Sequence, residues 1–396
     1  MLIRNVSLLH GKKLTYVDST NIRIIGEYIT EVGSALTPKN NEQTIDACGL
    51  LMMPGLINSH THIGDSIAKD IGIDSDVETK IHPIFGFKQK ILQNSGASHL
   101  ISFMKSSCFS MIKKGITTFV DFREGGIEGS RILRDATSGI PIRSIILGRI
   151  EYYQDLKSIR KNIPLPDTKK SLLDELLQIS DGIGISGANE FSNSTLKDFS
   201  KTKKLRAIHS SETEESVKLS QKITSKTETQ RALLTKPNFL VHMTYASKKD
   251  LQLAVRNNSS IVVCPRANGS LAEGIPDVDL MLKSGCNIGI GTDNVMINSP
   301  DIFREMDYLW KVSMGMKKKR ISPIDILKMA TVNASNYLGG KIGIIEKNKI
   351  ADCIFIEKHS IDLEPMHNPY AAIVQRVSEN TIKAVMFAGE IVYGKI

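Results

Sequence analysis

The stretch PGLINSHTHIGDSIAKD, residues 54–70, places two histidines two positions apart at the end of an apolar run. His60 and His62 could bind a metal ion, or they could be polar residues at the point where a buried strand reaches the surface. One such pair does not distinguish these alternatives. The remainder of the chain does, if it supplies further ligands in a suitable order.

Eight short runs rich in β-branched residues follow one another along the chain, and most are separated by amphipathic segments of helix length. Runs of this kind are typical of parallel strands that are buried on both faces. Eight of them are what a (β/α)8 barrel requires. The sequence therefore predicts an α/β fold with a TIM-type barrel, and the predicted strands are residues 55–60, 115–122, 140–148, 181–186, 205–210, 238–243, 260–265 and 287–293.

Both ends of the chain differ from this pattern. Residues 1–50 and 341–396 contain short alternating strands, such as NIRIIGEYITEVG at 21–33 and TIKAVMFAGEIVYG at 381–394. Neither end has many strands alone, so we expect the two ends to pair in one small composite β-sandwich domain. The barrel domain would then span residues 51–340.

The composition is that of an ordinary globular enzyme, with 41% hydrophobic and 23% charged residues in a chain of 396. The five cysteines are scattered and form no C-x-x-C pair, which favours a reducing compartment. The start of the chain has no signal-peptide pattern and no stretch is long enough to span a membrane, so we expect a cytoplasmic protein. The net charge of +9 is diffuse, with its densest cluster, KKKR, at 317–320, and it favours a lysine-rich surface over nucleic-acid binding.

Side chains that bind metals fall at the ends of four predicted strands. In chain order they are His60 and His62 (first strand), His209 (fifth), His242 (sixth) and Asp293 (eighth). Side chains at the C-terminal strand ends of such a barrel converge on one mouth. Imidazole nitrogens with one carboxylate suit Zn²⁺ with a position left open for water, and Fe²⁺ or another divalent metal would also fit. We therefore predict a metal site that includes His60 and His62.

Several longer stretches accompany these residues: MPGLINSHTHIGD, HSSET, VHMTYAS, CPRANGSLAEGIPDV, IGIGTDNVMINSPDIFREM and MATVNASNYLGG. In these stretches the chain resembles the amidohydrolase superfamily, almost from end to end. It is most similar to the aminohydrolase branch, which includes S-adenosylhomocysteine and methylthioadenosine deaminases, guanine and cytosine deaminases and chlorohydrolase-like relatives. Together the motifs are specific for the superfamily, less so for the branch, and poor indicators of the substrate.

The resemblance implies roles for the residues at the mouth. Four side chains would bind the metal: His60, His62, His209 and Asp293. His242 would lie beside the substrate and the metal-bound water, and Glu212 matches the proton-shuttling glutamate of the branch. The third and fourth predicted strands do not end in a lysine, which disfavours a carbamylated lysine between two metals, so we expect one divalent metal, with Zn²⁺ preferred and Fe²⁺ as the alternative.

The chemistry of such a site is consistent with deamination. A metal lowers the pKa of a bound water to ~7 and so supplies a hydroxide at neutral pH. Asp293 can accept or orient its proton, Glu212 can protonate a ring nitrogen and the leaving amine, and His242 can stabilise the tetrahedral centre. The alternative for Glu212 is a surface glutamate that begins a helix, where a carboxylate suits the helix dipole.

Three arginines also follow predicted strands: Arg123, Arg149 and Arg266. Arginine binds carboxylate or phosphate through two parallel hydrogen bonds, so an anionic substrate is one interpretation of these positions. Local ion pairs with Glu124, Glu151 or another acid are the other. Arg266 is the best candidate of the three. It stands where the family often has C-P-S-N and this chain has C-P-R-A-N at 264–268, a departure that argues against a simple copy of a nucleoside deaminase's pocket.

The loop DSIAKDIGIDSDVETKIHPIFGFKQKIL, residues 65–92, is long enough to act as a lid. His82, Phe85 and Phe87 could contact a heterocycle, although core packing is an equal alternative for the two phenylalanines. Asn294, next to Asp293, is a candidate to orient that carboxylate.

These observations predict a metal-dependent aminohydrolase that deaminates an aminoheterocycle, such as a purine, pyrimidine, pterin or nucleotide-like compound, with or without an anionic group. Hydrolysis of an amide or of a halogenated ring is the alternative within enzymes. A non-catalytic barrel used as a scaffold is a more distant alternative. Its signature would be the loss of metal ligands, and none of the expected ligands is missing here. Relatives are commonly homo-oligomers, so we expect one here.

Overall fold

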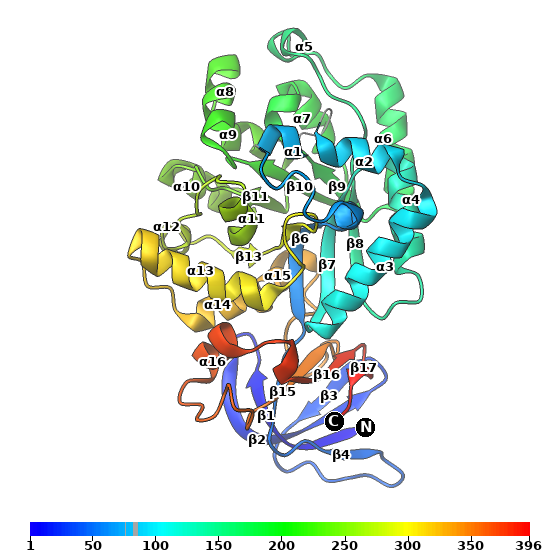
Figure 1. Ribbon diagram of the computed structural model, residues 1–396, viewed down its shortest axis with the longest axis vertical. Coiled ribbons are helices and arrows are strands. Elements are labelled where there is room, and N and C mark those ends of the chain that lie inside the picture. Colours follow the sequence, from blue (N-terminus) through cyan, green and yellow to red (C-terminus); the bar gives the residue numbers. More distant parts are fainter. Residues whose placement is uncertain (76, 82–85) are drawn as a thin grey trace.

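The computed structural model describes residues 1–75, 77–81 and 86–396, which form a barrel and a second sheet arranged end to end (Figure 1). All eight predicted barrel strands are present, parallel and in chain order around the sheet. The predicted (β/α)8 TIM-type barrel is therefore confirmed. Its strands are β6 (Leu56–His62), β7 (Ile116–Arg123), β8 (Arg143–Gly148), β9 (Gly182–Ile185), β10 (Leu205–Ser210), β11 (Phe239–His242), β12 (Ser260–Val263), and an eighth strand in two pieces, β13 (Ile288–Ile290) and β14 (Asp293–Asn294).

The break in the eighth strand closes the barrel. β13 pairs with β12, whereas β14 pairs with β6 and sets Asp293 opposite Thr61. Between the two pieces, a Cβ atom on Gly291 would lie 2.7 Å from the backbone oxygen of His60. Only glycine leaves room for this approach. The closure therefore brings Asp293 beside the two histidines at the end of β6.

The barrel strands are buried on both faces, as expected for parallel strands enclosed by helices. Every residue of β6, β7, β9, β11 and β12 is buried. Outer helices such as α3, α4 and α6 cover the sheet, and α1 and α2 lie at the end opposite the second sheet (Figure 1). The helices are α1 (Val77–Ile81), α2 (Phe87–Asn94), α3 (Ala97–Lys113), α4 (Gly126–Thr137), α5 (Leu156–Arg160), α6 (Asp167–Ile179), α7 (Asn193–Phe199), α8 (Glu214–Thr224), α9 (Glu228–Ala232), α10 (Lys248–Arg256), α11 (Pro265–Ser270), α12 (Val278–Lys283), α13 (Ile302–Lys317), α14 (Pro323–Met329), α15 (Val332–Leu338) and α16 (Pro369–Arg376).

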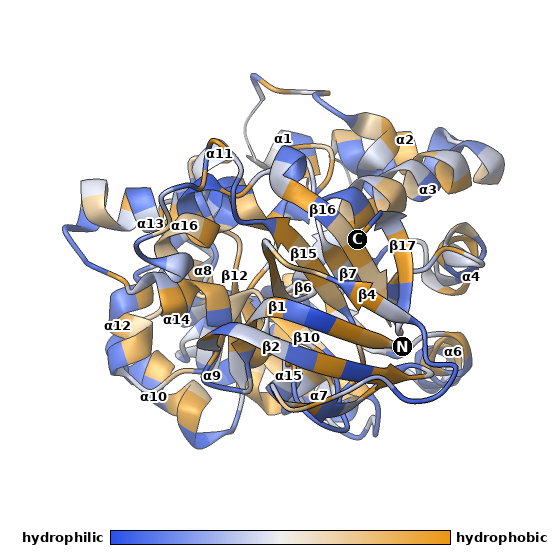
Figure 2. Cartoon of the chain, turned by 90° about the horizontal axis from the view of Figure 1, so that it is seen from below, coloured by the Kyte–Doolittle hydropathy of each residue, from blue (hydrophilic) through white to orange (hydrophobic). Residues whose placement is uncertain are grey.

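Strands from both ends of the chain form the second sheet, as predicted. Its order is β17-β16-β15-β5-β1-β2-β3, with β4 also paired to β1, so that C-terminal β15 joins N-terminal β5. Figure 2 views the molecule from this side and shows hydrophobic and hydrophilic residues following one another along β1 and β2. The strands are β1 (Leu2–His10), β2 (Thr15–Ile25), β3 (Tyr28–Val32), β4 (Thr44–Asp46), β5 (Leu50–Pro54), β15 (Cys353–Glu357), β16 (Ile382–Phe387) and β17 (Glu390–Gly394).

The second sheet continues directly into the barrel. β5 leads through Gly55 into β6, so the second sheet faces the N-terminal ends of the barrel strands and their C-terminal mouth lies at the far end (Figure 1). An ion pair of 2.5 Å between Arg143 of β8 and Asp352, just before β15, links the two parts. The predicted domain boundaries at 50/51 and 340/341 stay a prediction. Within the described part of the chain, no helix is both long and apolar enough to cross a membrane.

Candidate metal centre and active site

Three histidines from two barrel strands meet at the C-terminal mouth. His60 and His62 lie at the end of β6 and His209 lies near the end of β10, and one ring nitrogen of each is within 4.8 Å of the other two. Side chains two residues apart on a strand share a face, which explains why the H-x-H pair converges. His60 and His62 are both buried.

Hydrogen bonds orient two of these rings. Nδ1 of His62 donates to Oε1 of Glu124 at 2.8 Å and lies 3.1 Å from the backbone oxygen of Phe122. Nδ1 of His209 donates to the backbone oxygen of Ile185 at 3.1 Å. With the proton held on Nδ1, the lone pair of each ring lies on Nε2, which is the arrangement found in metal-binding histidines.

The ring of His60 differs from these two in its hydrogen bonding. Both Nδ1 and Nε2 of His60 are buried without a hydrogen-bond partner among the described residues, although Nε2 lies 3.3 Å from Oδ1 of Asp293. Burial lowers the pKa of His60 to about 3 and lowers the pKa of His209 well below its usual value, so both rings are neutral at pH 7. Neutral buried imidazoles with ring nitrogens left without a hydrogen-bond partner fit a bound divalent cation.

Asp293 completes the group from β14. Its Oδ1 lies 3.3 Å from Nε2 of His60 and 3.5 Å from Nε2 of His62. Burial opposes the carboxylate form, but the neighbouring histidines hold the pKa of Asp293 well below its usual range. Its φ of +59° is uncommon for a residue other than glycine, and such strained residues concentrate at functional sites. Sγ of the buried Cys264 is also within 4.8 Å of ligand atoms of His60 and Asp293.

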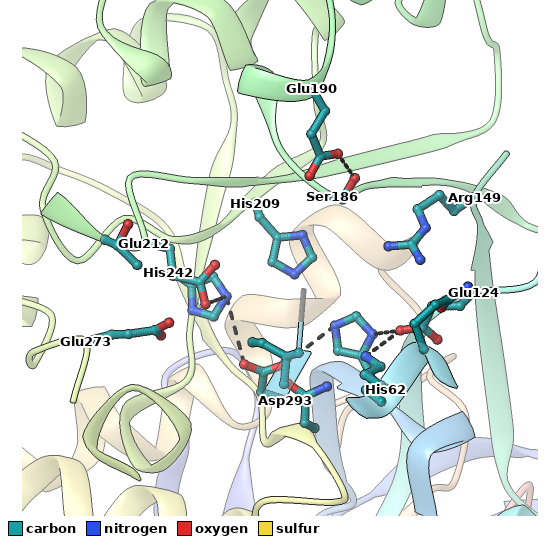
Figure 3. A pocket seen from close by; sticks show the side chains of 15 residues that line it. His62, Glu124, Arg149, Ser186, Glu190, His209, Glu212, His242, Glu273 and Asp293 are labelled. Carbon is teal, nitrogen blue, oxygen red and sulfur yellow. Dashed lines mark hydrogen bonds and ion pairs between the residues drawn. The ribbon is translucent and has the colours of Figure 1, made fainter. Parts of the chain in front are cut away.

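His242 and Glu212 face the same point from the neighbouring strand ends. Nε2 of His242 lies 3.2 Å from Oε1 of Glu212 and 3.9 Å from Oδ2 of Asp293. Nδ1 of His242 lies 3.4 Å from Oδ1 of Asn268. His242 also has a left-handed backbone, with φ of +70°. Figure 3 shows Glu212 and His242 on one side of His209, with His62 and Glu124 on the other.

These side chains open into a cavity of about 220 Å³. Most of the residues that line the cavity are polar or charged: among the described ones, Ile81 has the only wholly hydrocarbon side chain. A polar pocket with convergent titratable groups is a candidate site for a small polar ligand. The described lining residues are His62, Ile81, Lys88, Gln89, Glu124, Arg149, Ser186, Glu190, His209, Glu212, Thr213, His242, Glu273, Asp293 and Asn294.

The three predicted arginines have different surroundings. Arg149 lines the cavity, and its Nε and Nη2 atoms are buried without a hydrogen-bond partner among the described residues. Arg123 is buried against Gly64, where a Cβ atom would overlap its guanidinium, and it is not among the described lining residues. Arg266 is not among the described lining residues, and its Nη1 lies 3.4 Å from Oε1 of the fully buried Glu305. The alternative, a local ion pair, is present for all three arginines: Arg123–Glu124 at 3.7 Å, Arg149–Glu151 at 3.8 Å and Arg266–Glu305 at 3.4 Å. Of the three, Arg149 is the one found among the described lining residues.

The other residues predicted to contact the substrate also differ in their surroundings. Asn294 lines the cavity, but its Nδ2 donates to Oδ2 of Asp65 at 2.8 Å instead of orienting Asp293. Phe87 begins α2 and packs near Gly72, where a Cβ atom would lie 2.8 Å from its ring. His82 and Phe85 fall in residues 82–85, outside the described residues.

Four charged side chains of the cavity were not expected. Lys88 lies 2.5 Å from Oε1 of Glu124, and Glu124 keeps a pKa well below its usual value because Lys88, His62 and Arg123 outweigh the effect of burial. Glu190 accepts a short hydrogen bond from Ser186, and its burial raises its pKa to about 7. Glu273, the fourth, is buried beside Asn268. Glu124 directly follows β7, so the strand-end rule could have identified it.

The comparisons with known proteins agree with this architecture. A family model described as the amidohydrolase family matches residues 51–392. A protein of Methanothermobacter thermautotrophicus, provisionally named an aminohydrolase, is 36% identical over 396 residues, which covers 99% of each chain. A 5-methylthioadenosine/S-adenosylhomocysteine deaminase of Thermoanaerobacter pseudethanolicus is 28% identical over 415 residues, covering 99% of this chain and 93% of the relative.

A solved structure has the same fold. The crystal structure of an adenosine deaminase from Xanthomonas campestris with bound zinc matches with a TM-score of 0.84. The alignment covers 99% of this chain and 92% of that one at 17% identity. At this identity the likeness extends to the fold, and the activity has to be argued from the residues.

Proposed function

The chain belongs to the amidohydrolase family, and we propose that it is a metal-dependent aminohydrolase that deaminates a small aminoheterocycle. One observation carries this proposal: three histidines with converging ring nitrogens meet Asp293, and the pair His242–Glu212 faces the same cavity. The deaminase named among the relatives supports the same reaction.

Four side chains would hold one divalent cation: His60, His62, His209 and Asp293. The unsatisfied nitrogens of His60 and the free Nε2 atoms of the other two histidines support this assignment. Three imidazoles and one carboxylate favour Zn²⁺, with Fe²⁺ as the alternative. Such an ion supplies a nucleophile at neutral pH by lowering the pKa of bound water to ~7.

The side chains around the metal site then carry out the proton transfers of the reaction. Water adds to the C=N carbon of the heterocycle, the bond to the exocyclic nitrogen breaks, ammonia leaves and a carbonyl remains. Asp293 accepts and orients the proton of the attacking water. Glu212 delivers a proton first to the ring nitrogen and then to the leaving amine. His242, held by Asn268 through Nδ1, stabilises the tetrahedral centre when Nε2 carries a proton.

The cavity favours a polar substrate that carries an anionic group. Arg149 presents two buried nitrogens, Nε and Nη2, that have no hydrogen-bond partner among the described residues, and Nη2 lies 3.8 Å from Oε1 of Glu151. An arginine fork of this kind suits a carboxylate or a phosphate. We therefore propose that the reacting amidine lies at the histidines and that the anionic substituent extends to Arg149. Figure 3 shows Arg149 on the opposite side of His209 from Glu212.

The first test combines metal content with ammonia release. Protein purified without added metal is measured by mass spectrometry and then assayed with adenosine, S-adenosylhomocysteine, guanine, cytosine, pterins and phosphorylated aminopyrimidines. About one zinc or iron per chain and ammonia from one compound are expected. Bound metal without ammonia would contradict deamination and indicate an amide or halide leaving group. Absence of metal even after reconstitution would overturn the metal assignment and favour a scaffold.

We also propose that the enzyme is a cytoplasmic homo-oligomer. All five cysteines are free, which supports a reducing compartment. Mass photometry at nanomolar concentration tests the oligomer, and a fluorescent fusion tests the compartment. A monomer, or export of the fusion, would contradict the respective part of the proposal.

A further inference from the structure

Glu273 is presented to the cavity by a strained turn that follows α11. Its neighbours Ala272 and Gly274 both have left-handed backbone, with φ of +57° and +83°. For alanine this conformation costs about 1 kcal/mol. The backbone N–H of Glu273 donates to the backbone oxygen of Asn268 at 2.9 Å. The turn therefore holds Glu273 in place at a cost in backbone energy, as is common for functional residues.

The structure shows no cationic partner of the Glu273 carboxyl group among the residues that it describes. The side chain is 5% exposed, and no ion pair with a lysine, arginine or histidine is found for it in residues 1–75, 77–81 and 86–396. Nδ2 of Asn268 donates to Oε2 at 3.3 Å, whereas Oε1 is buried without a hydrogen-bond partner in that part of the chain. Oε1 is the atom free to carry a proton.

Glu212 is the group that Glu273 faces. Both residues line the cavity, and Figure 3 shows the Glu273 side chain pointing toward His242 and Glu212. Asp293 adds a further negative charge nearby. Two carboxyl groups in contact require a proton between them, because two carboxylates would repel each other strongly. Consistent with this geometry, burial and Glu212 raise the pKa of Glu273 to about 11.

We propose that Glu273 is a positioning residue for Glu212: as a neutral carboxylic acid it donates a hydrogen bond from Oε1 to the Glu212 carboxylate. The inference rests on the proposed deaminase function of the same site. Glu212 is then held between two partners, since its Oε1 also lies 3.2 Å from Nε2 of His242. Asn268 joins both partners, because it contacts Nδ1 of His242 and Oε2 of Glu273.

This arrangement serves the proton transfers of the reaction. A carboxylate that is 22% exposed, as Glu212 is, would otherwise sample several rotamers at the edge of the cavity. A fixed donor on one side leaves the lone pairs on the other side directed toward the substrate. Small errors in the position of a proton-transferring group lower the rate steeply.

The test uses three variants of the full, metal-loaded chain. E273Q keeps an N–H donor in place of the acid, whereas E273M keeps a similar volume without a donor. D279N, on α12 outside the cavity, is the matched control. On the compound that the wild type deaminates fastest in the panel above, we expect E273Q to stay within about threefold of the wild-type kcat and E273M to lose about ten- to a hundredfold, with KM changing much less.

Two results would overturn the inference. Equal losses in E273Q and E273M would mean that Glu273 acts as a carboxylate, and wild-type kcat in both would mean that it does not position Glu212. Infrared difference spectra of wild type against E273Q at pH 8 provide a readout without substrate. We expect the carbonyl band of a protonated carboxylic acid, and its absence would refute the neutral acid. The band without turnover of any compound would instead contradict the deaminase function.

Discussion

Nδ1 of His62 lies 2.8 Å from Oε1 of Glu124, and the same oxygen lies 2.5 Å from Nζ of Lys88. Lys88 comes from α2, which lies over the mouth, and Glu124 directly follows β7. A carboxylate behind a metal-binding histidine fixes its tautomer and makes the ring a stronger ligand. Glu124 therefore links the proposed metal ligand His62 to Lys88 on α2.

Glu124→Ala should weaken metal binding about 10- to 100-fold while leaving the proposed ligands intact. His62 loses the acceptor that holds its proton on Nδ1, so Nε2 no longer presents its lone pair as reliably. Competition with a chromophoric chelator measures the affinity for Zn²⁺. Glu128→Ala is the control, since Glu128 is largely exposed on α4. Equal affinities for the two variants would contradict the role of Glu124.

Chelation of the bound metal should lower the thermal unfolding midpoint of the wild type. An ion at about 1,000 times its Kd stabilises the folded chain by about 4 kcal/mol. His60→Ala should unfold at the same midpoint with and without the chelator, because His60 would be a central ligand. Differential scanning calorimetry makes the comparison. A shift in His60→Ala as large as that of the wild type would show that the metal binds elsewhere.

The barrel and the residues at its strand ends could be predicted because both depend on local pattern. Each of the β-branched runs forms a strand within a few residues of its predicted bounds. His60, His209, His242 and Asp293 lie at or near strand ends, and parallel strands in a closed barrel carry their ends to one mouth. No knowledge of side-chain packing is needed for that step.

Other parts of the cavity depend on long-range packing and were not predictable. Lys88 reaches the cavity from α2, and Glu273 reaches it from an irregular turn after α11. Arg149 directly follows β8 and Arg266 lies three residues after the end of β12, in the first turn of α11, yet of the two only Arg149 is among the described lining residues. The difference comes from Glu305, which α13 buries beside Arg266 from 39 residues further along the chain.

Glu212→Gln should abolish ammonia release without releasing the metal. An amide cannot carry the proton to the ring nitrogen, and loss of a general acid–base group typically lowers kcat about 10²- to 10⁴-fold. Glu214→Gln, two residues away and exposed in an ion pair with Lys218, should keep wild-type kcat. Steady-state ammonia release and metal content are measured on the same samples. Turnover by Glu212→Gln near the wild-type level would contradict the proposed proton transfer.

Arg149→Met and Arg266→Met should separate binding from stability. If the substrate anion lies on Arg149, Arg149→Met raises KM about 10- to 100-fold with a smaller change in kcat. Arg266→Met should leave KM unchanged and lower the unfolding free energy by about 2 kcal/mol, because the buried carboxyl group of Glu305 loses a hydrogen-bond donor. Kinetics and urea unfolding of both variants provide the test. A higher KM in Arg266→Met alone would reverse the assignment of the two arginines.

Glu305→Gln should make stability less dependent on pH between about 5 and 8. Burial raises the pKa of Glu305 from 4.5 to about 8, although Arg266 opposes the shift. In that window the folded chain holds a proton that the unfolded chain has released, so the unfolding free energy falls as the pH rises. One such group contributes a slope of at most about 1.4 kcal/mol per pH unit.

Glu305→Gln removes this contribution to the pH dependence of stability. Glu128→Gln changes an exposed residue on α4 and should retain it. Urea unfolding at half-unit steps of pH measures both slopes, and parallel curves for the two variants would show that Glu305 is already ionised at pH 5.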